Sequence, residues 1–213
     1  TPEGSDKIAI ISNNRPEWVF TDLAVQQIGA ILVPVYPTTN PNELAFILND
    51  AAVKYIFVSN EELLAKVNNI LDKVPSIKGV YTFDTIAGAQ HWSEVTELAT
   101  PALLTDVESV KATVPVDHLA TIIYTSGTTG TPKGVMLSHS NIYTNVQFSK
   151  KSFPFHDAPE SKVLSFLPLN HIFEKTCTYI HLYSGISIYY AESLETIGDN
   201  LKEIKPNGFT TVP

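Results

Sequence analysis

The stretch Tyr124–Gly134 reads YTSGTTGTPKG, and it directly follows an apolar run, Leu119–Tyr124, with the composition of a buried strand. Between its tyrosine and its lysine lie five Ser or Thr hydroxyls and two glycines. Glycines permit positive φ, so backbone N–H groups in such a loop can converge on an anion. The hydroxyls add neutral donors, and Lys133 adds a positive charge. The loop therefore suits a triphosphate or a departing pyrophosphate.

Other known loop motifs do not account for this stretch. The Walker loop requires G-x-x-x-x-G-K-[ST], whereas Thr131 and Pro132 separate Gly130 from Lys133. The G-x-G-x-x-G of dinucleotide folds is absent, and Ser126 lacks the first glycine of the G-x-S-x-G hydrolase elbow. An ordinary solvated turn would be shorter and poorer in hydroxyls. The pattern thus favours phosphate binding by a different type of loop.

Short apolar runs alternate with helical patterns on both sides of this loop. Expected strands cover residues 7–12, 30–36, 54–58, 77–83, 119–124, 134–138, 162–167, 186–191 and 208–212. Expected helices cover residues 17–28, 41–49, 62–73, 141–150, 172–184 and 194–204. Such alternation predicts an α/β fold of mostly parallel sheets flanked by helices.

The pattern weakens between Asp84 and Pro115. A helix is compatible with His91–Leu98, but Pro101 and Pro115 bracket a polar stretch that we interpret as a long connection between two sheet regions. A subdomain boundary near residue 115 is the corresponding prediction.

Composition narrows the class of protein. The chain has 213 residues, 44% of them hydrophobic, and a net charge of −8. No apolar run approaches the roughly 20 residues of a membrane span. The acidic balance argues against a nucleic-acid partner, which needs a basic face. The single cysteine, Cys177, cannot form an intrachain disulfide, which fits a reducing, cytoplasmic setting. Peripheral contact with a membrane and the oligomeric state stay open.

The segment YTSGTTGTPKGVMLSH resembles the signature of the adenylate-forming superfamily, which includes acyl-CoA synthetases, luciferases and peptide-synthetase adenylation domains. The segments Asn14–Trp18, Gly29–Thr38 and Leu167–Glu174 are similar to those of long-chain acyl-CoA synthetases. That branch often has Ser or Ala in place of Asn170 and Arg in place of Lys175. The resemblance covers nearly the whole chain.

This resemblance implies that residues 1–213 form part of the large N-terminal AMP-binding domain, with the C-terminal lid domain absent. It also implies a two-step reaction. A fatty-acid carboxylate attacks the α-phosphate of ATP to give an acyl-adenylate and pyrophosphate, and coenzyme A then displaces AMP. ATP, Mg²⁺ and coenzyme A are the cofactors and co-substrates that follow, with a fatty acid as the substrate.

The resemblance further assigns roles to particular residues. The expected phosphate-binding residues are Thr125, Ser126, Gly127, Thr128, Thr129, Gly130 and Lys133. Thr125 is also the expected contact to Mg²⁺, and Gly127, Gly130 and Gly134 would permit loop motion. His171 is the candidate catalytic residue, orienting the substrate carboxylate or shaping the acyl channel. Without the resemblance it would be interpreted as a structural histidine at a loop-to-helix junction. Glu174 and Lys175 are expected to form an exposed pair of little energetic value.

Several family elements cannot be matched within residues 1–213: the adenine-binding segment, the Mg²⁺-binding Glu, the ribose-binding Asp and the catalytic Lys. The chain is therefore expected to show little ligase activity by itself. Two alternatives stay open. One is adenylation of another carboxylate, as in peptide synthetases, and the other is a non-catalytic nucleotide-binding module.

Overall fold

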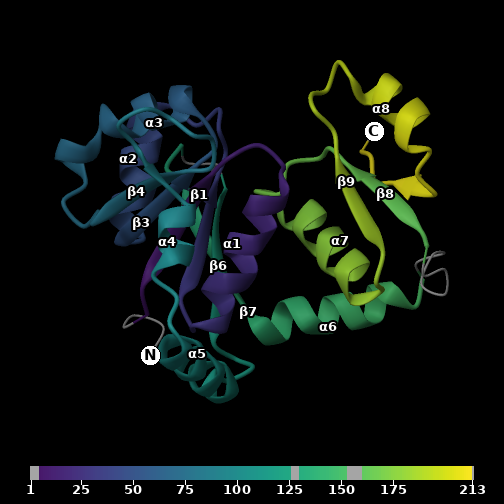
Figure 1. Cartoon of the computed structure of the whole chain (residues 1–213), viewed down its shortest axis with the longest axis horizontal. Coiled ribbons are helices and arrows are strands. Elements are labelled where there is room, and N and C mark those ends of the chain that lie inside the picture. The colour runs from purple at the N-terminus through teal and green to yellow at the C-terminus, as the bar shows by residue number, and fades with distance from the viewer. Residues whose placement is uncertain (1–4, 126–129, 153–159, 213) are drawn as a thin grey trace. The chain divides into compact units, whose positions relative to one another are not determined.

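The computed structural model describes residues 5–125, 130–152 and 160–212 (Figure 1). The chain divides into two compact units. The first comprises Thr1–Asn13 and Glu17–His139, and the second comprises Asn14–Pro16 and Ser140–Pro213. The boundary expected near residue 115 falls inside the first unit. Each unit has its own sheet.

The first unit is built on a seven-stranded sheet in the order β5-β4-β3-β1-β2-β6-β7. Its strands are β1 (Lys7–Ile11), β2 (Ile31–Val35), β3 (Val53–Val58), β4 (Gly79–Thr82), β5 (Gln90–His91), β6 (Leu119–Thr125) and β7 (Lys133–Ser138). All neighbouring strands are parallel except β6 and β7, which form an antiparallel pair. The predicted α/β fold with a mostly parallel sheet is confirmed.

Helices cover both faces of this sheet, because its central strands consist mostly of apolar residues. All five residues of β2 are buried. One face packs against α2 (Pro41–Asp50) and α3 (Glu61–Asn68), whose buried side chains share a core with alternate residues of β1, β2 and β3. Trp18 and Val25 of α1 (Pro16–Gln27) are buried outside that core, and Figure 1 shows α1 away from α2 and α3.

The start of α2 follows the predicted cap. The Asn40 side chain accepts a hydrogen bond from the Glu43 backbone N–H at 3.0 Å, and Pro41 occupies the first turn, where it needs no N–H partner. The predicted helix over residues 62–73 is divided, because α3 ends at Asn68 and a short 3₁₀ turn covers Leu71–Lys73.

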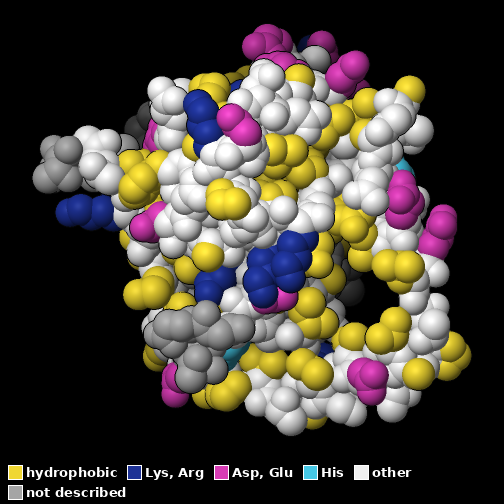
Figure 2. Space-filling view, turned by 90° about the vertical axis from the view of Figure 1, so that its left-hand side faces the viewer, with side chains coloured by type: hydrophobic (Ala, Val, Ile, Leu, Met, Phe, Trp, Pro, Cys, Tyr) yellow, Lys and Arg dark blue, Asp and Glu magenta, His cyan; other side chains and the backbone are white. Residues whose placement is uncertain are grey.

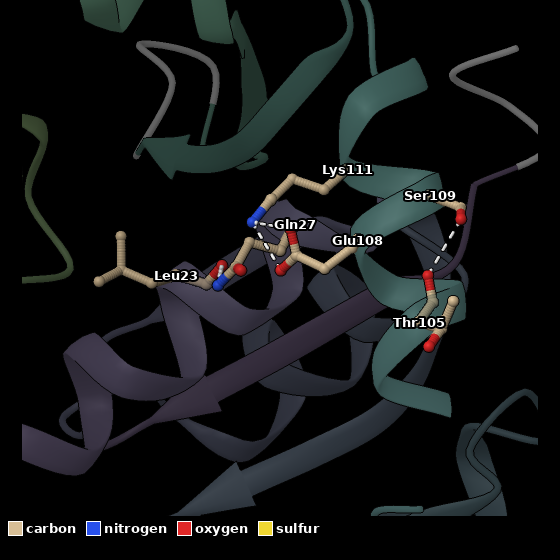
Figure 3. Close-up of polar contacts among 6 residues, drawn as sticks. All are labelled: Leu23, Gln27, Thr105, Glu108, Ser109 and Lys111. Atoms are coloured by element: carbon tan, nitrogen blue, oxygen red, sulfur yellow. Dashed lines mark hydrogen bonds and ion pairs between the residues drawn. The ribbon is translucent and has the colours of Figure 1, made fainter. Parts of the chain in front are cut away.

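The connection between Asp84 and Pro115 was predicted only in part: the structure has a helix within His91–Leu98, where one was compatible with the sequence, but the helix after Thr100 was missed. The connection contains α4 (Ser93–Glu97) and a longer helix, α5 (Pro101–Thr113), which starts at a Thr100 cap. No residue of α5 is buried, so the apolar spacing that identifies most helices is weak here. Its polar contacts are local ones. Ser109 donates to the Thr105 carbonyl at 3.0 Å, and Lys111 donates to Glu108 at 2.7 Å, beside Gln27 of α1 (Figure 3).

The second unit carries a small parallel sheet in the order β10-β8-β9. Its strands are β8 (Lys162–Ser165), β9 (Ser187–Tyr190) and β10 (Gly208–Phe209). Its helices are α6 (His139–Lys150), which begins at the last residue of the first unit, α7 (Ile172–Tyr183) and α8 (Ile197–Ile204). The chain passes from β8 to α7 through residues 166–171, the segment that carries the candidate histidine.

The surface is mixed in character. Basic, acidic and hydrophobic side chains are interspersed on the face shown in Figure 2. Among the helices for which the structure gives coordinates, none is long and apolar enough to cross a membrane.

Candidate phosphate loop and histidine site

The candidate phosphate loop connects the antiparallel strands β6 and β7. Thr125, the last residue of β6, lies opposite Lys133, the first residue of β7, so the pairing register brings these two side chains to the mouth of the loop. Both are exposed. Gly130 is exposed as well, and its φ of +82° is a conformation that glycine adopts without strain. Ser126, Gly127, Thr128 and Thr129 lie outside the described residues, so their phosphate contacts stay predictions.

Gly134 has a steric role at the base of this loop. It lies in β7 opposite Tyr124, and a Cβ at this position would come within 2.8 Å of Ile122 Cγ2 and 3.1 Å of Tyr124 Cζ. The absence of a side chain lets the neighbouring strand pack its own side chains across this position. A role of Gly134 in loop motion stays a prediction, whereas close packing already accounts for the residue type.

A polar contact also holds the base of the loop. The Tyr124 hydroxyl donates to Asp50 Oδ2 at 2.6 Å, which joins the strand before the loop to the last residue of α2. Burial and the Asp50 carboxylate both raise the pKa of the Tyr124 phenol, so the phenol keeps the proton that it donates. Sequence reasoning missed this pair, since an aspartate 74 positions away gives no sign of such a contact.

The structure places His171 in the second unit, where it caps the N-terminus of α7. Its Nδ1 accepts a hydrogen bond from the Phe173 backbone N–H at 3.2 Å. An accepting Nδ1 carries no proton, so the neutral ring has its proton on Nε2. His171 is exposed. The segment before α7 thus presents an imidazole of defined tautomer, whose Nε2–H can donate a hydrogen bond.

The expectation for Glu174 and Lys175 was wrong. Each side chain is only 1% exposed, so they do not form an exposed surface pair. Glu174 accepts hydrogen bonds from Ser165 Oγ and Thr210 Oγ1, at 2.5 and 2.9 Å. Burial raises the pKa of Glu174, and these two bonds act in the opposite direction. The sequence gives no sign of the Glu174 contacts, because Ser165 and Thr210 lie 9 and 36 positions away from it.

Comparison with known proteins gives this arrangement a family. A family model described as AMP-binding enzyme matches residues 3–213, a range that includes the phosphate loop and His171. The chain belongs to the AMP-binding enzyme family. The resemblance inferred from the loop is therefore confirmed at the level of the family.

The relatives within this family include long-chain acyl-CoA synthetases. The chain is 34% identical over 221 residues to the peroxisomal long chain acyl-CoA synthetase 6 of Arabidopsis thaliana, and 31% identical over 220 residues to human long-chain-fatty-acid–CoA ligase 1. These matches cover 100% and 97% of this chain, but it spans only 31% of the length of either relative.

Solved structures show the same fold. A red-emitting luciferase from Phrixothrix hirtus matches 97% of this chain with a TM-score of 0.80 and 22% identity, over 40% of its own length. The N-terminal domain of FACL13 from Mycobacterium tuberculosis matches 98% of it with a TM-score of 0.74 and 20% identity, over 50% of its own length. The AMP-binding enzyme fold therefore extends over nearly all of the chain.

Proposed function

We propose that this chain supplies the ATP-phosphate-binding part of a fatty-acid–CoA ligase. The observation that carries the proposal is the β6–β7 pair, which sets Thr125 opposite Lys133 at the two ends of a glycine- and hydroxyl-rich loop. Membership of the AMP-binding enzyme family supports the reaction class, and the similarity to long-chain acyl-CoA synthetases supports a fatty acid as the substrate.

In the proposed reaction, a carboxylate oxygen of the fatty acid attacks the α-phosphorus of ATP. The new P–O bond gives an acyl-adenylate as the bond to pyrophosphate breaks. The thiol of coenzyme A then loses its proton, attacks the acyl carbon and displaces AMP. In the first step Lys133 and the loop hydroxyls, from Thr125 to Thr129, would hold the β- and γ-phosphates and stabilise the charge of the departing pyrophosphate.

The phosphate loop offers only some of the oxygen ligands that a magnesium ion needs. Thr125 offers a hydroxyl oxygen, and the residues that the structure describes contain no group of three or more His, Cys, Asp or Glu that could hold a metal ion. Mg²⁺ commonly keeps several waters and binds through substrate phosphates with few protein ligands. We therefore propose that Thr125 contacts a magnesium ion that ATP brings, and that the ion, when bound, neutralises part of the phosphate charge.

His171 is the proposed contact to the acyl substrate. With its proton on Nε2, the neutral imidazole can donate one hydrogen bond to a carboxylate oxygen. Such a donor would orient the fatty-acid carboxylate for attack.

The cellular compartment is a separate part of the proposal. The single cysteine favours a cytoplasmic protein, whereas the Arabidopsis relative is described as peroxisomal.

Affinity for MgATP tests the phosphate-binding role directly. We expect Lys133→Ala to weaken MgATP binding by the 213-residue chain about tenfold, or about 1.4 kcal/mol, as measured by isothermal titration calorimetry. Lys73→Ala is the matched control, because Lys73 is also an exposed lysine of the first unit but lies outside the loop. Equal affinities of wild type and Lys133→Ala would contradict the proposal.

Substrate-dependent pyrophosphate exchange tests the alternatives. With the product of the complete reading frame, we expect exchange between pyrophosphate and ATP to require a long-chain fatty acid. Exchange with amino acids instead would favour a peptide-synthetase type of adenylation. MgATP binding without exchange for any carboxylate would favour a non-catalytic nucleotide-binding module.

A further inference from the structure

Asn14 makes three side-chain hydrogen bonds within the second unit, all to residues that lie before His171. Its Nδ2 donates to Ser165 Oγ at 3.1 Å and to the Leu167 carbonyl at 2.7 Å. Its Oδ1 accepts from the Leu169 backbone N–H at 3.0 Å. Both amide protons and the amide oxygen are therefore used on one short segment about 150 positions further along the chain.

A second anchor lies just after His171. Because Ser165 Oγ accepts a proton from Asn14, it can direct its own hydrogen to Glu174 Oε1, at 2.5 Å. The other carboxyl oxygen of Glu174 accepts from Thr210. A directed chain of hydrogen bonds thus runs from Asn14 through Ser165 to Glu174, in the first turn of α7. Such chains polarise one another and rigidify a buried region when every member is satisfied.

The segment between these anchors is partly buried and closed by a backbone turn. Leu169 and Asn170 are buried, and the His171 backbone N–H closes a turn onto the Pro168 carbonyl at 2.9 Å. His171 itself is exposed, with its Nδ1 on the Phe173 N–H. A turn fixed on both sides leaves the imidazole with a defined origin and direction. This is the arrangement expected of a group that must meet a substrate in one geometry.

We propose that Asn14 and Glu174 are positioning residues for His171, acting through the backbone of residues 165–171 and the first turn of α7. Neither residue is assigned contact with a substrate. The proposal rests on the proposed function for the role of His171 as a substrate contact. The effect of Asn14 and Glu174 on the position of His171 can, however, be measured without an activity assay. A hydrogen bond between Asn14 and Leu169 N–H is a direct contact, whereas the Phe173 N–H reports on the His171 cap and does not touch Asn14.

Amide hydrogen exchange by NMR tests the link in the 213-residue chain. In Asn14→Ala we expect the Phe173 amide to exchange about tenfold faster, since the turn that holds the capping imidazole loses its anchor. Asn13→Ala is the matched control, because Asn13 is the neighbouring asparagine and is exposed. Unchanged Phe173 exchange in Asn14→Ala would overturn the proposal.

A second variant covers the case in which Asn14→Ala does not fold. Ser165→Ala interrupts the chain towards Glu174 and leaves the Asn14 contacts with Leu167 and Leu169 in place. We expect a smaller increase in Phe173 exchange, about threefold. Unchanged Phe173 exchange in Ser165→Ala would overturn the role of Glu174. If Asn14→Ala also fails to fold, the same result would overturn the whole proposal.

Steady-state kinetics of the protein encoded by the complete reading frame test the effect on function. We expect Asn14→Ala to lower kcat for acyl-adenylate formation about tenfold while the KM for ATP changes less than about twofold, at a temperature where both proteins are folded. Equal losses in kcat and in ATP affinity would indicate a general structural defect and overturn a positioning role. If the wild type forms no acyl-adenylate, the proposed function fails, and the exchange experiment still decides whether Asn14 holds His171.

Discussion

The two loops that carry the candidate site residues are held in different ways. The loop after Thr125 starts and ends on paired strands, and Ile122 and Tyr124 pack where Gly134 has no side chain, with one hydrogen bond to Asp50. Residues 166–171 lead into the helix α7. Asn14 binds Leu167 and Leu169 within this segment, and Thr210 binds Glu174 just beyond it. The comparison indicates that side-chain packing stabilises the paired strands at the base of the first loop, whereas hydrogen bonds stabilise the second segment.

The largest effect is expected at Gly134, where side chains pack closely at the base of the phosphate loop. Gly134→Val places a branched side chain within the space that Ile122 and Tyr124 fill, so we expect a loss of about 3 kcal/mol in the free energy of unfolding. Urea denaturation measures it. Gly198→Ala is the control, because a Cβ there meets nothing within 4 Å and alanine favours the helix α8. A Gly134→Val protein as stable as wild type would show that this contact is not limiting.

The same contrast explains which features could be predicted from the sequence and which could not. The alternation of apolar runs and helical patterns predicted the sheet, and the loop was recognisable because its glycines and hydroxyls are themselves the chemistry. The anchors were not recognisable, because Asn14, Asp50 and Glu174 are ordinary polar residues whose partners lie far away for the first two and in a buried region for the third. Their roles exist only once the chain has folded.

The helix α5 was missed for a different reason, because local signals for it were present in the sequence. Sequence patterns reveal a helix through the face that it buries, and α5 buries none of its residues. Local signals were nevertheless present: Thr100 followed by Pro101 is a cap with proline in the first turn, and no breaker follows before Pro115. Giving these end signals more weight than periodicity would have found the helix.

A pH experiment tests the buried titratable groups of the second unit. Burial lowers the pKa of His181 from its ordinary value of 6.5 to about 4. Between these values the unfolded chain takes up a proton that the folded protein does not, so stability falls as the pH decreases from 6.5 towards 4. We expect this contribution to reach about 2 kcal/mol. Urea denaturation at several pH values should show a flatter dependence in His181→Gln.

Glu174 provides a control of opposite sign for that experiment. Its pKa is raised by burial, so the folded protein retains a proton over a range in which the unfolded carboxyl has lost it. This contribution stabilises the fold in acid and is lost as the pH rises through the folded pKa. Glu174→Gln should therefore steepen the acid-side decline that His181→Gln flattens. Identical pH dependences in wild type and both variants would contradict the account of buried titrating groups.

The smallest effect is expected for the one hydrogen bond at the base of the phosphate loop. Tyr124→Phe removes the bond to Asp50 but keeps the ring over Gly134, and the exposed Asp50 carboxylate can turn to water. We expect a loss of about 1 kcal/mol in the free energy of unfolding, and a change in MgATP affinity below about twofold. Tyr143→Phe is the matched control, since Tyr143 is exposed.

The order of these effects is what tests the comparison. If packing stabilises the base of the phosphate loop, Gly134→Val must cost more than Tyr124→Phe, and Asp50→Ala should add little once the hydroxyl is gone. A double-mutant cycle between Tyr124→Phe and Asp50→Ala measures the coupling, expected at about 1 kcal/mol. A coupling above the cost of Gly134→Val would reverse the assignment: side-chain hydrogen bonds would then stabilise both regions, and Asp50 would anchor the base of the first loop as Asn14 is proposed to anchor the second segment.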